Sequence, residues 1–214
     1  MTCLLCQQDD QPMTREHVFA HWLVLKVHGG RLVASGRSSG NTPSSTADAR
    51  IARTIATGVC ADCNAGWMSS LEVSFRRMVF ARPRVGILPA PDRVALSRWF
   101  TKTAVLLAHA QGGELLTAAR RAQLMSGMPD DVEVFLARRR RPPQRLDFAV
   151  DLDGDGIDAS AERRVRSVAI LVDDLVGRVA LRDTLGSRHG TRLWPLRTHA
   201  LRWETLPVTS SHGL

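Results

Sequence analysis

All four cysteines of this 214-residue chain stand in two Cys-x-x-Cys pairs, Cys3/Cys6 and Cys60/Cys63, separated by a long interval. Such a turn holds two thiolates close enough to bind one metal ion, and two turns supply a closed tetrahedral zinc site. Two disulfides or a redox dithiol are the alternatives. The first ten residues do not resemble a secretory signal, so we expect a cytoplasmic protein, in which stable disulfides are disfavoured. The pattern therefore predicts one structural zinc.

Hydrophobic patterning predicts an α+β protein in which helices precede an antiparallel sheet. Helices are expected over 14–28, 64–80, 93–111 (with Asp92 as the N-cap) and 117–126. Strands separated by short turns are expected over 132–137, 145–150, 165–172, 177–182, 192–196 and 200–206. The proline-rich stretch 82–91 is the best boundary, which divides the chain into a zinc module, 1–81, and a helical and β part, 82–214.

The charge of the chain favours a polyanionic partner. Twenty-nine basic residues face 21 acidic ones, a net charge of +8, and only Lys26 and Lys102 among the basic residues are lysines. Arginine presents a planar fork of donors that suits phosphate. No stretch is long and apolar enough for a membrane span, and no basic amphipathic helix stands out. Nucleic acid is therefore the expected partner, with no membrane association.

Two further features lie within the frame of the cysteines. Glu16-His17-Val18 stands between the pairs, and Asn64 directly follows Cys63. Together with the cysteines these residues resemble the HNH (ββα-metal) endonuclease superfamily, in particular its zinc-stapled branch. The segment from Gly66 to Glu72 (GWMSSLE) is similar to a bacterial subgroup of HNH-like proteins. The resemblance covers about residues 1–80 and implies a treble-clef-like fold for this part of the chain.

The resemblance also implies roles for these residues. Glu16 and Asn64 would bind one catalytic divalent ion, and His17 would act as the general base on water. Independent chemistry agrees, because hard oxygen ligands suit Mg²⁺ or Mn²⁺ and a histidine titrates near neutral pH. The function so implied is a metal-dependent endonuclease that hydrolyses phosphodiester bonds, in DNA rather than RNA.

The chain departs from the family pattern at two points, which keep a rival interpretation open. Glu16 stands where the family usually has Asp, and the middle Asn has no counterpart, since 50–58 offers only Arg53, Thr54 and Thr57. The rival is a zinc-dependent nucleic-acid-binding protein without cleavage. A third possibility is a protein-interaction module.

Another metal motif ranks lower. Asp151, Asp153, Asp155 and Glu162 match the spacing of an EF-hand loop. The residues before the loop are patterned as a strand, however, whereas an EF-hand requires a helix. We therefore expect a polar turn between strands that binds calcium weakly or not at all.

Overall fold

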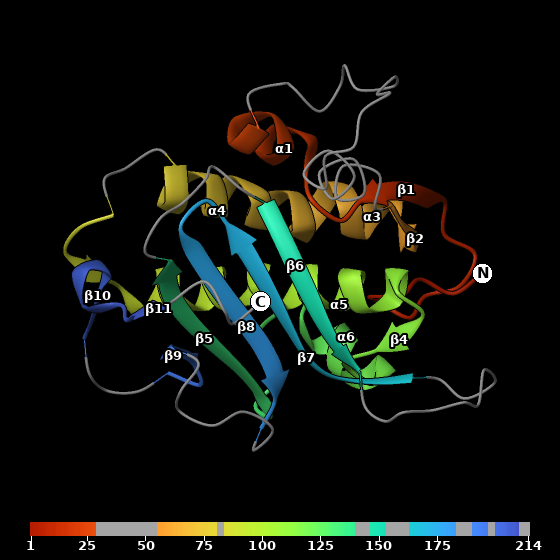
Figure 1. Ribbon diagram of the computed structural model, residues 1–214. Helices are drawn as coiled ribbons and strands as arrows, with labels where there is room; N and C mark the ends of the chain where they lie inside the picture. Colours follow the sequence, from red (N-terminus) through yellow and green to blue (C-terminus); the bar gives the residue numbers. More distant parts are fainter. Residues whose placement is uncertain are drawn as a thin grey trace, which may run out of the picture.

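The computed structural model (Figure 1) describes residues 1–28, 55–80, 84–139, 146–152, 163–182, 190–196 and 200–209. It shows a mixed α/β architecture in which a sheet packs on one long helix, α5 (Ala90–Ala110). A second helix, α4 (Ser69–Phe80), runs beside α5, and α1 (His21–His28) lies over α4. The expected combination of helices and a largely antiparallel sheet is confirmed.

The first strand lies where the sequence predicted the start of a helix. β1 (Met13–His17) pairs antiparallel with β2 (Ile55–Cys60), and α1 begins only at His21. The prediction of a helix from Thr14 is therefore wrong at its N-terminal end. Helical spacing of apolar residues could not reveal the competing ladder, because the partner strand lies some forty residues further along the chain.

The segment after β2 is almost continuously helical. α3 (Ala61–Cys63) passes into a π-helical turn, η2 (Asn64–Met68), and then into α4, with a kink at Gly66. A π turn commonly occurs near functional sites. Two strands and a following helix thus frame the second cysteine pair.

The long helix α5 starts earlier than predicted. Pro89 precedes it and Ala90 is its first residue, so Asp92 lies in the first turn and is not the N-cap. A carboxylate in that turn still interacts favourably with the helix dipole. The helix ends at Ala110, two residues before Gly112, the predicted stop, whose φ of 72° suits glycine. The next helix, α6 (Ala118–Gln123), is shorter than the predicted one.

In the described parts of the chain, seven strands form the main sheet, in the order β11-β5-β8-β7-β4, with β6 also beside β7 and β9 also beside β5. The pairs are antiparallel except β4 with β7 and β11 with β5. The strands are β4 (Gly113–Glu114), β5 (Val132–Arg139), β6 (Leu146–Leu152), β7 (Arg163–Val172), β8 (Leu175–Leu181), β9 (Thr191–Trp194) and β11 (Val208–Thr209).

The strand predicted over 200–206 is wrong for most of its length. Only β10 (Leu201–Arg202) is extended, and it pairs with β3 (Ile87–Leu88) outside the main sheet. A 3-10 turn, Trp203–Thr205, follows. Trp203 is buried there, so the apolar residues that suggested a strand serve the core in a different backbone conformation.

A glycine sets the distance between α5 and the sheet. A Cβ on Gly177 of β8 would lie 2.2 Å from ring atoms of Phe100, which is fully buried on α5. Such an approach is far inside van der Waals contact. The ring therefore packs directly on the strand backbone, and only glycine fits at this position.

One buried apolar cluster contains residues from both sides of the predicted boundary at 82–91. Phe75 of α4 stacks on Trp99 of α5, with ring centroids 3.6 Å apart. The division into 1–81 and 82–214 stays a prediction about the organisation of the chain. Among the described residues, no helix is long and apolar enough to cross a membrane.

Candidate functional site

The four cysteines converge into one cluster. Their sulfur atoms all lie within 4.8 Å of one another, and all four are free thiols. Cys3 Sγ lies 4.0 Å from Cys63 Sγ, and Cys6 Sγ lies 3.7 Å from Cys60 Sγ. A tetrahedral site with Zn–S bonds of about 2.3 Å requires sulfurs about 3.8 Å apart, whereas a disulfide requires about 2 Å. The cluster thus fits a structural zinc. Each of these two short sulfur–sulfur distances joins one Cys-x-x-Cys turn to the other.

Backbone hydrogen bonds hold the two turns together. Leu4 N–H donates to the Gly58 carbonyl at 2.7 Å, and Ala61 N–H donates to the Pro12 carbonyl at 2.8 Å. The N–H groups of Cys60 and Cys63 point at the sulfurs of Cys3 and Cys60, each at 3.4 Å. N–H donors directed at sulfur stabilise a thiolate, as metal binding requires.

The pKa values of three of the thiols are shifted, in different directions. Burial raises the pKa of Cys3, but N–H donors from Cys6, Cys60 and Leu5 outweigh it and bring that pKa to about 7. Burial raises the pKa values of Cys6 and Cys63. Four thiolates so close would repel one another, and a Zn²⁺ ion would remove that penalty.

Glu16 and Asn64 lie near each other, next to the second cysteine pair. Both side chains are half-buried, and the Asn64 side chain lies close enough to the Glu16 carboxylate to lower its pKa. Asn64 Nδ2 also donates to Thr14 Oγ1 at 3.3 Å. With the amide nitrogen so engaged, the carbonyl oxygen of Asn64 is its remaining group that can bind a hard cation. Two of the predicted site residues, from β1 and from the start of η2, are therefore neighbours.

An irregularity in the strand pair lies at this point. The register between β1 and β2 shifts between Thr14 and Glu16, and Gly58 adopts a φ of 86°. A bulge with a glycine in the left-handed region bends a strand and changes the direction of nearby side chains. The bulge thus lies opposite the segment that carries Thr14 and Glu16, next to the second cysteine pair.

His17 is the last residue of β1, and its side chain is exposed. Its charge lowers the pKa of Glu16, although this influence is smaller than that of burial. Successive residues of a strand point to opposite faces, so His17 does not share the face of Glu16 by alternation alone. The imidazole is exposed to solvent at the end of the strand.

Two residues without an assigned role in the sequence-based prediction lie close to Glu16. Burial raises the pKa of the Glu16 carboxyl; the positive charge of Lys102 and the nearby Asn64 side chain oppose this, while the negative charge of Glu72 adds to it. Lys102, on α5, is 2% exposed and binds Glu72 Oε1 at 2.6 Å. Trp99 Nε1 donates to the same oxygen at 2.8 Å. A largely buried ion pair between α4 and α5 thus lies near the candidate site.

The sequence contained a signal for this pair. Lys102 is one of only two lysines and stands in the middle of a helix that is otherwise patterned as buried. A lysine in such a position is almost never buried without a partner. Its partner, Glu72, lies at the end of the GWMSSLE segment, but nothing in the sequence indicates that the two residues meet.

The other predicted sites fall mainly outside the described residues. Arg53 and Thr54, where the family's middle Asn would stand, are not among them, nor is the segment 153–162 of the EF-hand-like loop. Asp151 is exposed at the end of strand β6, so a strand and not a helix precedes that loop, as predicted.

Comparisons with known proteins give no relative for this chain: no family model, no curated protein and no solved structure matches it. A functional assignment therefore depends on the geometry of the cysteine cluster and of the polar residues beside it.

Proposed function

We propose that the chain is a divalent-metal-dependent endonuclease of the HNH type, acting on nucleic acid, DNA rather than RNA. The observation that carries the proposal is the proximity of Asn64, hydrogen-bonded to Thr14 of the same strand, to Glu16, next to a four-cysteine cluster. Glu16 comes from β1 and Asn64 from the start of η2, and these are the two residues that the resemblance makes ligands of the catalytic ion. A treble-clef-like description of residues 1–80 belongs to the same proposal.

Local charge supports a cation at this place. Glu16 and Glu72 bring two negative charges, and Lys102 brings one positive charge, into a partly buried environment. A net negative charge in such surroundings attracts a cation, and oxygen ligands favour Mg²⁺ or Mn²⁺. Glu16 and the carbonyl oxygen of Asn64 would hold the ion, which would stabilise the negative charge that develops on the leaving oxygen.

The chain's own groups would supply the remaining chemistry. His17 is exposed at the strand end, where its imidazole would accept a proton from the attacking water. Lys102 and Glu72 lie near enough for their charges to shift the pKa of Glu16, and they would tune the charge of its carboxylate. The zinc-bound cysteines would hold β1 and η2 in place relative to each other, and would thereby position Glu16 and Asn64.

A second candidate is a zinc-dependent nucleic-acid-binding protein that does not cleave. The specific observation in its favour is the position of His17, which follows Glu16 directly in a strand and therefore points to the other face by alternation. The absence of the family's middle Asn from the sequence favours the same alternative.

The two candidates differ in the effect of His17→Ala. Zinc-loaded wild type and variant are incubated with Mg²⁺ or Mn²⁺ and a panel of supercoiled plasmid, branched DNA, single strands and structured RNA. The proposal predicts cleavage by the wild type and a loss of about 10²–10⁴-fold in the variant, with zinc content unchanged. Salt-sensitive binding without cleavage of any substrate would instead favour the binding protein. Equal rates for both proteins would show that His17 is not the base.

A further inference from the structure

A second feature of the surface lies between α1 and α4, away from the cysteines. An open groove of about 540 Å³ is lined by Trp22, Leu25, Lys26, Arg76 and Phe80. Trp22 and Phe80 meet edge to face, with centroids 5.9 Å apart, and form an apolar base. Leu25 is 39% exposed, which is high for a leucine on a helix that packs against another.

The charge of this groove is entirely positive. Lys26 and Arg76 are exposed, and no carboxylate is among the described residues that line the groove. The Arg76 guanidinium carbon lies 5.5 Å from the centroid of the Trp22 ring. A cation–π contact holds the guanidinium in place but, unlike a carboxylate, leaves its charge unneutralised. Arg76 is therefore fixed and still able to bind an anion.

The groove is connected to the candidate catalytic site by the exposed face of α4. Ser69, Ser70 and Val73 are exposed along that face, whereas the only carboxylate of the helix, on Glu72, turns inward to Lys102. A polyanion lying along α4 would thus meet no negative side chain of this helix. Twelve residues separate Asn64 from Arg76, roughly 18 Å at 1.5 Å per residue, which corresponds to roughly five nucleotides of one strand.

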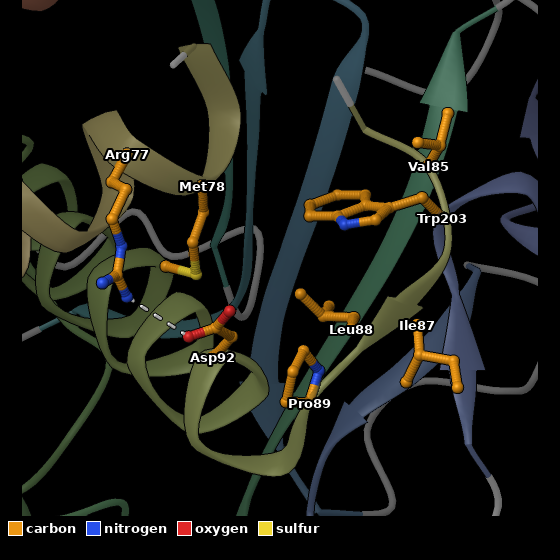
Figure 2. A pocket seen from close by; sticks show the side chains of 8 residues that line it. All are labelled: Arg77, Met78, Val85, Ile87, Leu88, Pro89, Asp92 and Trp203. Atoms are coloured by element: carbon orange, nitrogen blue, oxygen red, sulfur yellow. Dashed lines mark hydrogen bonds and ion pairs between the residues drawn. The ribbon is translucent and has the colours of Figure 1, made fainter. Parts of the chain in front are cut away.

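A second pocket on the surface lacks the net positive charge of the groove. It has a volume of about 150 Å³ and lies where Leu88 and Trp203 meet the start of α5 (Figure 2). Its two charged residues, Arg77 and Asp92, form an ion pair with each other at 3.5 Å. It therefore offers no net charge to a polyanion.

We propose that the groove between α1 and α4 binds one strand of a nucleic acid, with Lys26 and Arg76 on its phosphates and Leu25 against its sugars or bases. The inference rests on the proposed function for the identity of its ligand. It adds a second contact region, several nucleotides from the bond that is cut, which sets the affinity and the orientation of the substrate without taking part in the chemistry.

The test is fluorescence anisotropy with the full-length, zinc-loaded chain, without added Mg²⁺ or Mn²⁺, on a fluorescein-labelled 20-base-pair DNA duplex and its single strand. The groove variant is Lys26→Gln/Arg76→Gln. The matched control, Arg77→Gln/Arg202→Gln, removes the same charge at arginines that face carboxylates, Asp92 and Glu204. The groove variant should bind at least one probe about tenfold more weakly, and its dependence on log salt should be shallower by about two units on duplex. The control should stay close to wild type.

Equal weakening by both double variants would reduce the effect to net charge and overturn the proposal. Unchanged binding by the groove variant would also overturn the proposal. So would a wild type that binds neither probe, and the groove would then serve a partner of another kind. Cleavage is measured separately. Cleavage by a wild type whose groove variant binds normally would contradict this inference alone, whereas groove-dependent binding without cleavage would contradict the proposed catalysis alone.

Discussion

The region around the cysteines and the region around α5 achieve stability in different ways. In the first, two short strands and a helical turn surround four sulfurs within 4.8 Å of one another. In the second, a 21-residue helix is buried for most of its length and packs on a seven-stranded sheet. The first region also buries Leu5, Val18 and Val59, but we expect it to depend mainly on a bound metal, whereas the second depends on hydrophobic burial. The candidate site lies where they meet, at Glu16, Glu72 and Lys102.

The largest expected effect concerns the metal. Cys60→Ser should abolish zinc binding and unfold the cysteine region, since a structural zinc contributes roughly 10–16 kcal/mol of apparent binding free energy. Hydrogen exchange measured by mass spectrometry should show lost protection in β1, β2 and α3, with more protection retained in β7 and β8. A variant that keeps its zinc and its protection would remove the contrast between the two regions.

The next effect tests the ion pair of Lys102 with Glu72, where the cysteine region meets the α5 region. Lys102→Met leaves Glu72 buried without its cation and should destabilise the fold by about 3–5 kcal/mol, measured by urea denaturation. The double variant Lys102→Met/Glu72→Gln should recover part of this loss, because no unpaired charge remains. Lys26→Met, on an exposed lysine, is the control and should change stability little. A harmless Lys102→Met would show that the pair does not join the two regions.

A smaller effect tests the packing of α5 on the sheet. Gly177→Ala places a Cβ 2.2 Å from ring atoms of Phe100 and should cost about 1–3 kcal/mol through overpacking. Gly127→Ala is the matched control, because a Cβ there meets nothing within 4 Å. Equal unfolding midpoints for the two variants would contradict the close approach of helix and strand.

The smallest effect concerns pH. Burial raises the pKa of Glu16 above the usual 4.5. The folded protein therefore loses stability as the pH rises from 4.5 towards the raised pKa, because the buried carboxyl ionises less readily than in the unfolded chain. Glu16→Gln should therefore gain in Tm relative to wild type over that interval. The pKa of Glu204 is lowered by the Gly86 N–H, so stability is lost as pH falls towards its folded pKa. Glu204→Gln should accordingly become less stable than wild type above pH 4.5. Tm differences of the same sign would contradict these assignments.

The sequence predicted those parts of the fold that depend on local pattern. The cysteine spacing predicted the metal cluster, the apolar run over 93–111 predicted α5, and strand-like segments separated by short turns predicted β5 to β8. It failed where a distant partner decides the conformation: residues 13–17 form a strand because β2 pairs with them, and Trp203 is buried in a 3-10 turn. The proximity of Glu16 and Asn64 was implied by a resemblance. The position of Lys102 near them, in contrast, could be found only from the packing of α5 on α4.

The most direct test of the metal-dependent account is native mass spectrometry of the purified chain beside mass spectrometry after denaturation. We expect the native mass to exceed the denatured mass by one zinc ion, and alkylation under denaturing conditions to label Cys3, Cys6, Cys60 and Cys63. A metal-free native protein, or a denatured chain four protons lighter with two disulfides and no reactive thiol, would contradict the account.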